Sequence, residues 1–282
     1  MLHRALRPVQ QGFYVDVGAN DPVCHSITKA FYERGWRGIN IEPVQSWFGK
    51  IDAGRSEDVN LQIAITDTDD GEADFYEVTG TGLSTLHETI AQRHAGEHGY
   101  NIEKRTVVTA TLTSVLDRYA PAEIHFLNID AEGAERAVLK GLDLAKHRPW
   151  IVLVEATLPN TQIEPHGEWE PLLITRGYHF VYFDGLNRFY VADEHATLDK
   201  SFHAPANAFD DFITASAVDL DQQLNAANAE LEKVKAELGE VTAEVQYVKL
   251  HLAHTTNKLR VMQRSAAWRA LERIRYLTGL SS

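Results

Sequence analysis

Acidic residues lie at the ends of four apolar stretches that the sequence predicts to be strands. These stretches, at 13–17, 38–41, 124–129 and 150–154, are rich in β-branched and aromatic residues, which is typical of buried strands. The acids are Asp16, Glu42, Asp130 and Glu155. In an open α/β sheet the carboxyl ends of parallel strands share one edge, where ligands bind. Because burying unpaired charge is costly, four carboxylates there predict a binding site.

The turn after the first strand suits a nucleoside. Gly18 permits a tight turn and Asn20 follows it, so that with Asp16 they would lie at the mouth of the site. This turn has one glycine where the dinucleotide fingerprint needs three, and Pro22 lacks the N–H that a pyrophosphate would use. A ligand without phosphates, such as S-adenosylmethionine, fits better. An ordinary strand–turn–helix without a ligand is the alternative.

Two further acids match parts of such a nucleoside. Glu42 lies 24 residues after Gly18, near the spacing of about 20 residues at which an acid meets a ribose, and a carboxylate accepts from both ribose hydroxyls. Asp67 follows a predicted strand at 59–65 and could accept a hydrogen bond from the adenine amine. A solvated strand end and a surface loop are the alternatives for these two acids.

Several side chains could activate a hydroxyl acceptor. His166 titrates near neutral pH and is a candidate general base, and Asp130 or Glu155 would serve if burial raises its pKa. Asp130, Glu132 and Glu155 could instead hold Mg²⁺ or another hard cation, which prefers carboxylate oxygens. A loop position in a turn rich in proline and glycine is the alternative for His166.

The elements that position these residues alternate between strand and helix, which predicts a parallel α/β sheet. The β-rich runs 177–183 and 187–191 flank Asp184-Gly185-Leu186 and predict a hairpin, so the globular part ends on an antiparallel pair. The remaining predicted elements are helices at 26–34, 112–119 and 133–140 and strands at 59–65, 73–78 and 107–110.

Two other segments lack the repeating pattern of apolar residues that indicates a helix or a strand. Residues 80–86 are rich in glycine, threonine and serine and form a candidate lid or substrate loop that includes Ser84. Residues 192–214 look irregular, and we expect their phenylalanines to tie them to the domain. These are Phe202, Phe209 and Phe212.

Composition limits the classes of function. The 282 residues are 44% hydrophobic and 24% charged, which allows a sizeable core. A net charge of −13 argues against nucleic acid as a main partner, because phosphate binding needs basic surface. The single cysteine, Cys24, fits a reducing cytoplasm. Without an export signal or a run of about 18 apolar residues, we expect a cytoplasmic protein whose membrane contacts are peripheral.

A heptad pattern begins near Leu220 and predicts a coiled coil at 216–262, after a globular domain at 1–215. A helix from about 219 to 276 would be about 85 Å long at 1.5 Å per residue. We expect this coil to join copies of the chain into a homo-oligomer. Its apolar contact face, or seam, has leucine at one heptad position and valine at the other, which fixes neither the number nor the direction of the chains. The seam is Leu224, Ala227, Leu231, Val234, Leu238, Val241, Val245, Val248, Leu252, Thr255, Leu259 and Met262.

The tail at 263–282 is basic and amphipathic. Six basic residues and one acid give a net charge of +5 over 258–282. Its apolar stripe is Trp268, Leu271, Ile274 and Leu277. Such a helix can lie on an anionic membrane. A continued coil with solvated arginines and a site for an acidic protein are the alternatives.

The motifs together resemble the FkbM family of S-adenosylmethionine-dependent methyltransferases over about residues 12–212. The matching segments are 15–20 (VDVGAN), 41–43 (IEP), 129–135 (IDAEGAE) and 183–188 (FDGLNR). The resemblance implies a class I methyltransferase fold, a Rossmann-like and mostly parallel seven-stranded sheet with an antiparallel last strand. By position, Asp16, Gly18 and Asn20 would line the methionine end and Glu42 the ribose.

Two departures from the family pattern stand out. Asp21-Pro22 replaces a second glycine, and Asn128 stands where the family usually has lysine. Losing that lysine removes a cation beside Asp130 and Glu132, which raises the question of how these two carboxylates are neutralised.

The family methylates hydroxyl oxygens in natural products or bacterial surface sugars. We therefore predict an O-methyltransferase acting on a sugar, with acceptor contacts from Tyr182, Asp184, Asn187 and Arg188. Its coil would set the spacing of active sites or dock the enzyme on a glycan-assembly complex at the inner face of the membrane. A polyketide acceptor is one alternative. The other is a scaffold that binds a nucleoside without catalysis and works through its coil.

Overall fold

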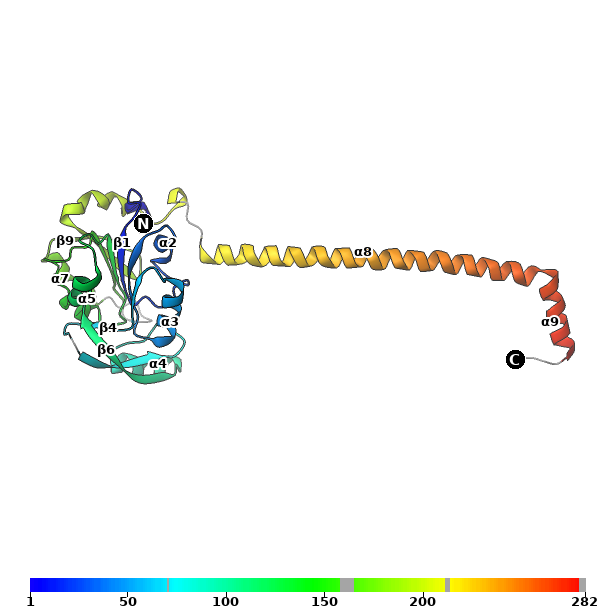
Figure 1. Ribbon diagram of the computed structural model, residues 1–282, viewed down its shortest axis with the longest axis horizontal. Helices are drawn as coiled ribbons and strands as arrows, with labels where there is room; N and C mark the ends of the chain where they lie inside the picture. Colours follow the sequence, from blue (N-terminus) through cyan, green and yellow to red (C-terminus); the bar gives the residue numbers. More distant parts are fainter. Residues whose placement is uncertain (70, 158–164, 211–213, 279–282) are drawn as a thin grey trace. The chain divides into compact units, whose positions relative to one another are not determined.

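The chain divides into two units, Met1–Phe212 and Ile213–Ser282. The computed structural model describes residues 1–69, 71–157, 165–210 and 214–278 (Figure 1). The first unit contains two β-sheets with their helices, and the second consists of helix. No helix in the described ranges has the length and apolar character that crossing a membrane requires.

A seven-stranded sheet forms the centre of the first unit, in the order β3-β2-β1-β7-β8-β10-β9. The strands are β1 (Phe13–Val17), β2 (Arg37–Ile41), β3 (Val59–Leu61), β7 (Phe126–Ile129), β8 (Ile151–Glu155), β9 (Tyr178–Phe183) and β10 (Asn187–Ala192). Only β10 is antiparallel to its neighbours β8 and β9, and the other pairs that join β3, β2, β1, β7 and β8 are parallel. The predicted class I methyltransferase sheet with its closing hairpin is confirmed.

Helices cover both faces of this sheet. They are α1 (Leu2–Ala5), α2 (Lys29–Tyr32), α3 (Gln45–Gly54), α5 (Leu112–Tyr119), α6 (Glu135–Lys140) and α7 (Glu170–Ile174). Val15 of β1 faces a core shared with α5, α6 and α7, whereas its neighbour Tyr14 faces a second core shared with α1 and α2. Because both faces are buried, the central strands are continuous apolar runs. The predicted helix at 112–119 is confirmed, and α2 and α6 are shorter than the predicted 26–34 and 133–140.

A second sheet has the order β4-β6-β5. Its strands are β4 (Ala64–Thr66), β5 (Gly71–Val78) and β6 (Ile102–Thr111), and α4 (Glu88–His98) lies between β5 and β6 in sequence. The predicted single strand at 59–65 is wrong, because residues 59–61 pair with β2 while residues 64–66 pair with β6. A continuous apolar run does not show where a chain leaves one sheet for another. The predicted strands at 73–78 and 107–110 are confirmed, in longer form.

The segment after β10 contains the 3₁₀ helices η2 (Asp193–Ser201) and η3 (Ala208–Asp210) rather than irregular chain. Phe202 is buried as expected, but the expectation for Phe209 is wrong, since it is 88% exposed; Phe212 lies outside the described residues. An ion pair fixes this segment instead. Arg4 pairs with Asp210 and also donates hydrogen bonds to the carbonyl oxygens of Ser201 and Ala204.

The second unit contains α8 (Ala215–Arg264) and α9 (Ala266–Thr278). The Thr214 hydroxyl caps α8 by accepting from the N–H of Ala217. The predicted single helix at 219–276 is wrong at one point: Ser265 has an extended backbone, with φ −70° and ψ 153°, and separates the two helices. Serine caps helices readily, so a second helix starts where the heptad pattern ends.

Candidate functional site

An open cleft of about 730 Å³ lies at the carboxyl ends of β1, β2 and β7. Gly18, Glu42 and Asp130 line it from the central sheet. The opposite side comes from Trp47 of α3, from Ile63 to Ile65, and from Phe75 and the 80–86 loop, including Thr81, Gly82 and Ser84. The cleft is therefore where the strand-end acids predicted it, and its far wall is built by the second sheet and its loop.

Gly18 brings the chain against β7. Its φ of +82° is in the left-handed region, and a Cβ at this position would lie 1.7 Å from the carbonyl oxygen of Asp130. Any side chain would therefore clash with backbone as well as strain the turn. Asn20, also with positive φ, follows at the cleft wall, and its Oδ1 is a buried atom without a hydrogen-bond partner among the described residues. The turn thus leaves room and one acceptor atom for a ligand.

Glu42 directly follows β2 and is buried, with 5% of its surface exposed. Its carboxylate accepts hydrogen bonds from the N–H of Asn20 at 2.9 Å and of Val44 at 2.7 Å. Burial raises its pKa to about 7, although these two hydrogen bonds act in the opposite direction. A carboxylate has about four acceptor positions. Two are used here, so two remain for the paired hydroxyls of a ribose.

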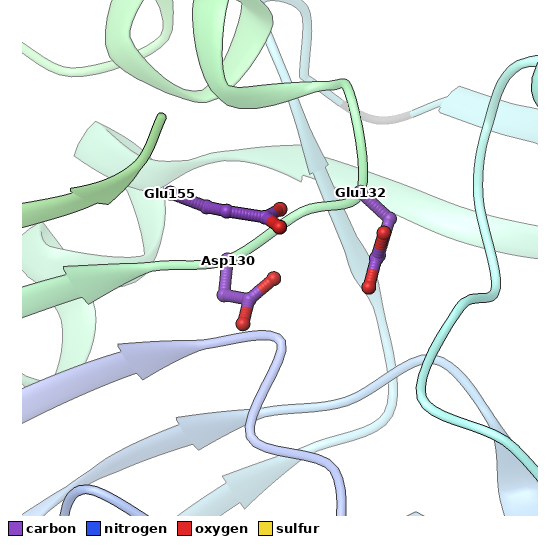
Figure 2. A group of neighbouring side chains, drawn as sticks. All are labelled: Asp130, Glu132 and Glu155. Carbon is purple, nitrogen blue, oxygen red and sulfur yellow. The ribbon is translucent and has the colours of Figure 1, made fainter. Parts of the chain in front are cut away.

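Three more carboxyl groups converge beside Gly18. One oxygen from each of Asp130, Glu132 and Glu155 lies within 4.8 Å of the others (Figure 2). Asp130 and Glu132 line the cleft, and Glu155 lies behind them at the end of β8. Burial, and then the charges of neighbouring acids, raise the pKa of Glu132 and Glu155, and burial dominates the raised pKa of Asp130 as well. The loop that carries Glu132 is held by Glu135, whose carboxylate accepts the N–H groups of Ala131 and Gly133.

Asp16 is buried beneath this site. It is not among the described residues that line the cleft, and its carboxylate accepts hydrogen bonds from Asn128 Nδ2 at 2.9 Å and Thr28 Oγ1 at 3.0 Å. Burial raises the pKa of Asp16, and the charge of Arg55 lowers it. Arg55 is 3% exposed and donates to Tyr14 and Thr28. Asp16 therefore anchors the strand ends, and its predicted contact with the ligand stays untested.

A sequence profile of the Methyltransferase FkbM domain matches residues 16–180, more than half of the chain. The chain belongs to the FkbM methyltransferase family. The family assignment fits the sheet order and the cleft described above.

Two solved structures are similar to this FkbM-family chain. A methyltransferase FkbM from Methylobacillus flagellatus KT shares 13% identity with a TM-score of 0.39, over 64% of this chain and 44% of that one. A TehB-like SAM-dependent methyltransferase from Corynebacterium glutamicum ATCC 13032 Kitasato shares 6% identity with a TM-score of 0.36, over 68% of this chain and 86% of that one. The chain thus spans less than half of the Methylobacillus protein. It has no match among curated proteins.

The family implies S-adenosylmethionine as methyl donor, and the cleft fits this ligand. The Gly18 turn packs directly against the Asp130 backbone at the cleft wall, the unpartnered Asn20 Oδ1 can accept from an ammonium group, and Glu42 keeps acceptor positions for a ribose. Sequence reasoning missed Trp47, whose Nε1 donates to the Thr81 carbonyl at 3.0 Å and joins α3 to the loop. The available signal was an aromatic residue just after the Glu42-Pro43 motif.

Asn128 stands where the resemblance led us to expect a lysine, and it is buried on β7. The Asn128 amide supplies Asp16 with a hydrogen bond, and Arg55 supplies the nearby positive charge. Arg55 had not been singled out from the sequence, because nothing near it in the chain marks it as a partner of the first strand. Arg55 lies near β1 only because the chain after α3 packs against that strand, where Arg55 donates a hydrogen bond to the Tyr14 hydroxyl.

Other predicted site residues lie apart from the cleft wall. Asp67 lies 3.9 Å from Lys140 Nζ, and half-buried His166 begins the 3₁₀ helix η1 (His166–Glu168). Asp184 closes the hairpin turn by accepting from the N–H groups of Leu186 and Asn187, and Arg188 pairs with Glu170 at 2.9 Å. Ser84 does line the cleft. Catalytic or substrate roles for these residues remain predictions.

Proposed function

We propose that this FkbM-family chain is an S-adenosylmethionine-dependent O-methyltransferase whose acceptor is a sugar hydroxyl in a bacterial surface glycan. One observation carries the proposal: a single cleft holds Gly18 and Glu42, which suit a nucleoside donor, beside Asp130 and Glu132, which suit a reacting hydroxyl. The acceptor side is polar, with carboxylates and Ser84 within reach of a ligand. Such a wall matches the many hydroxyls of a sugar better than a largely apolar polyketide.

Methyl transfer to an alcohol requires alignment and removal of a proton. S-adenosylmethionine supplies an electrophilic methyl group when bound. In our proposal Glu42 orients the ribose and the Gly18 turn accommodates the methionine end. Asp130 accepts the hydroxyl proton as the new C–O bond forms and the bond between the methyl carbon and the donor sulfur breaks, which leaves S-adenosylhomocysteine; Asp130 suits this role because it lines the cleft and burial raises its pKa. Glu155 lies beside Asp130, with one oxygen of each within 4.8 Å of the other.

The proposal is tested by methyl transfer from labelled S-adenosylmethionine to sugars, glycan fragments and hydroxylated polyketides. We expect turnover on sugars and a loss of about 100-fold or more in Asp130→Asn, as for loss of a general base. His166→Gln is the matched control, since His166 is not among the described residues that line the cleft. The opposite ranking of the two variants would make His166 the base. Transfer only to polyketides would refute the sugar acceptor.

The scaffold alternative depends on the missing family lysine. Asn128 supplies Asp16 with a hydrogen bond, and Asp130 and Glu132 still line the cleft, so the departure leaves the proposed site residues in place. An enzyme loses its cellular role in Asp130→Asn, whereas a scaffold keeps it. Complementation of a deletion strain by this variant therefore separates the two functions.

We also propose that α9 contacts an anionic membrane surface, which would place the enzyme at the inner face of the membrane. Leu271 and Leu277 are 60% and 82% exposed on a helix that also carries arginines, and such a helix binds acidic headgroups. The full chain should float with vesicles containing phosphatidylglycerol and not with phosphatidylcholine alone. Leu271→Glu should abolish flotation. Flotation unaffected by this change would leave an acidic protein or a glycan-assembly complex as the partner.

A further inference from the structure

We propose that Asp130, Glu132 and Glu155 form a divalent-cation site at the acceptor side of the cleft. The inference deepens the proposed function, on which its catalytic consequence rests, but cation binding itself can be measured without methyl transfer. Figure 2 shows the three carboxylates lying around a common space, and one oxygen from each lies within 4.8 Å of the others. Oxygens on opposite sides of one Mg²⁺ or Ca²⁺ are about 4 to 5 Å apart, so one ion can contact all three.

The groups around the cluster favour the binding of a cation. After burial, the neighbouring carboxylates have the largest effect on the pKa values of Glu132 and Glu155. Glu155 is 94% buried, and its Oε2 is aimed into the cluster without a hydrogen-bond partner among the described residues. Glu132 also has one such oxygen. Buried carboxylates whose oxygens are not satisfied by donors either bind protons or bind a cation.

The backbone presents these groups as ligands. Asp130 follows β7, Glu155 ends β8, and the two strands are parallel neighbours, so their ends share one edge. Glu132 reaches the same point because its residue has a positive φ of 49°, at a turn that Glu135 holds from below. The ligands therefore come from two rigid strands and one fixed turn. Because Asp130 and Glu132 line the cleft, an ion there would polarise an acceptor hydroxyl and lower its pKa. One oxygen of Asp130 would bind the ion, and its other oxygen would still accept the hydroxyl proton.

The test is calorimetric titration of the full chain with Mn²⁺ and Mg²⁺ at pH 8, without any methyl donor. We expect one ion per chain, at least tenfold weaker binding in Glu132→Gln and Glu155→Gln, and weaker binding at pH 6 because protons compete for the carboxylates. Glu42→Gln is the matched control, as it removes a neighbouring buried carboxylate outside the cluster, and it should bind within threefold of the unmodified chain.

Folding is checked in parallel by the thermal midpoint. Both glutamine variants replace a buried carboxyl group by a neutral amide of similar size, so without cation they should melt at or above the midpoint of the unmodified chain, and only the unmodified chain should gain stability when Mn²⁺ is added. No binding at millimolar Mn²⁺, or equal binding in the cluster variants, would overturn the cation site. The donor affinity is unaffected by that outcome, so the two proposals can fail separately.

A different observation carries a second proposal: α8 associates with a second copy of this chain in parallel and in register. Ten large apolar seam residues are 46–66% exposed on α8. They are Leu224, Leu231, Val234, Leu238, Val241, Val245, Val248, Leu252, Leu259 and Met262. Five heptads of such residues are a coiled-coil seam without a partner in the single chain.

The flanking charges select the direction. Glu230, Glu237 and Glu244 occupy the g positions, whereas Lys235 and Lys249 occupy e positions. In a parallel pair, g meets the e position five residues further along the other chain, which places Glu230 opposite Lys235 and Glu244 opposite Lys249 of a second copy. Lys258 also occupies a g position. In an antiparallel pair centred on Glu244, g meets g and e meets e, so Glu230 would face Lys258, but Glu244 would oppose Glu244 and Lys235 would oppose Lys249. The parallel pair has no such like-charge contacts between these residues.

The test measures oligomeric mass by light scattering and direction by a disulfide. In a Cys24→Ser background, Leu238→Cys should form an interchain disulfide under oxidation, because seam residues meet their own counterparts only in the parallel arrangement. Reversing both lysines to glutamate should weaken association at least tenfold, and also reversing Glu230 and Glu244 to lysine should restore it. A monomeric chain, or an oligomer that forms no disulfide, would overturn the proposal.

Discussion

Replacing Glu42 by glutamine should weaken donor binding while leaving stability nearly unchanged. Burial raises the pKa of Glu42 from 4.5 to about 7, so the ionised group costs about 3 kcal/mol in the folded chain at pH 8, at 1.36 kcal/mol per pKa unit. Glutamine removes that cost. It also leaves one of the two N–H groups, of Asn20 or Val44, without its acceptor, which costs about 1 to 3 kcal/mol. The two changes nearly cancel.

Donor affinity has no such compensation. Two hydrogen bonds from ribose hydroxyls to a carboxylate become at most one to a neutral amide, so we expect a loss of about 2 kcal/mol, or about 30-fold. Calorimetry with S-adenosylhomocysteine measures it. The unmodified chain should bind about tenfold more weakly at pH 6 than at pH 8, because Glu42 is then protonated. The dependence should be smaller in Glu42→Gln.

Glu57→Gln is the control, since Glu57 is an exposed acid on the loop after α3. It should bind S-adenosylhomocysteine like the unmodified chain. Equal affinity of Glu42→Gln and the unmodified chain at pH 8, with both proteins folded, would refute the ribose role. A large fall in the melting temperature of Glu42→Gln would refute the cancellation and show that the carboxylate is mainly structural.

Three further outcomes follow from the same geometry. Gly18→Ala should abolish S-adenosylhomocysteine binding and lower the melting temperature, because its Cβ would meet the Asp130 carbonyl; unchanged binding would contradict the close approach. Arg55→Met should destabilise the fold by about 3 kcal/mol or more in urea unfolding, since buried Arg55 donates hydrogen bonds to Tyr14, Thr28 and the Pro22 carbonyl, and all are lost; a change below 1 kcal/mol would contradict the importance of these hydrogen bonds. Without cations, the melting temperature should fall from pH 5 to pH 8, because Glu42 and the cluster acids have raised folded-state pKa values and the favourable protonated state is lost as pH rises; a midpoint that rises over this range would contradict it.

Local pattern was enough to predict the strands and the acids at their ends. Strand β1, helix α5 and the closing hairpin follow from apolar runs, helical period and the Asp-Gly turn, all of which are properties of neighbouring residues. The heptads of α8 are equally local. The break at Ser265 was missed because a serine is compatible with a helix interior and with a cap, and only the backbone conformation decides between them.

The pattern of apolar and polar residues did not predict the far wall of the cleft. The run at 59–65 gives no sign that β3 and β4 belong to different sheets, yet this crossing brings Ile63 and Ile65 to the site. The motif predicted acceptor contacts for Asp184 and Arg188, but Asp184 accepts hydrogen bonds in the hairpin turn and Arg188 pairs with Glu170 of α7. A motif records which residues recur, not the direction in which the fold turns their side chains.

The sequence by itself determined the sheet, the strand-end carboxylates and the long amphipathic helix, because strand and helix periods and parallel pairing fix which residues share an edge or a face. Only the tertiary structure decided which partners each of those carboxylates contacts. Asp16 accepts hydrogen bonds from Asn128 and Thr28, Glu42 holds two backbone N–H groups, and Asp130, Glu132 and Glu155 converge. Their different roles arise from burial and from partners distant in the chain, which no local pattern contains.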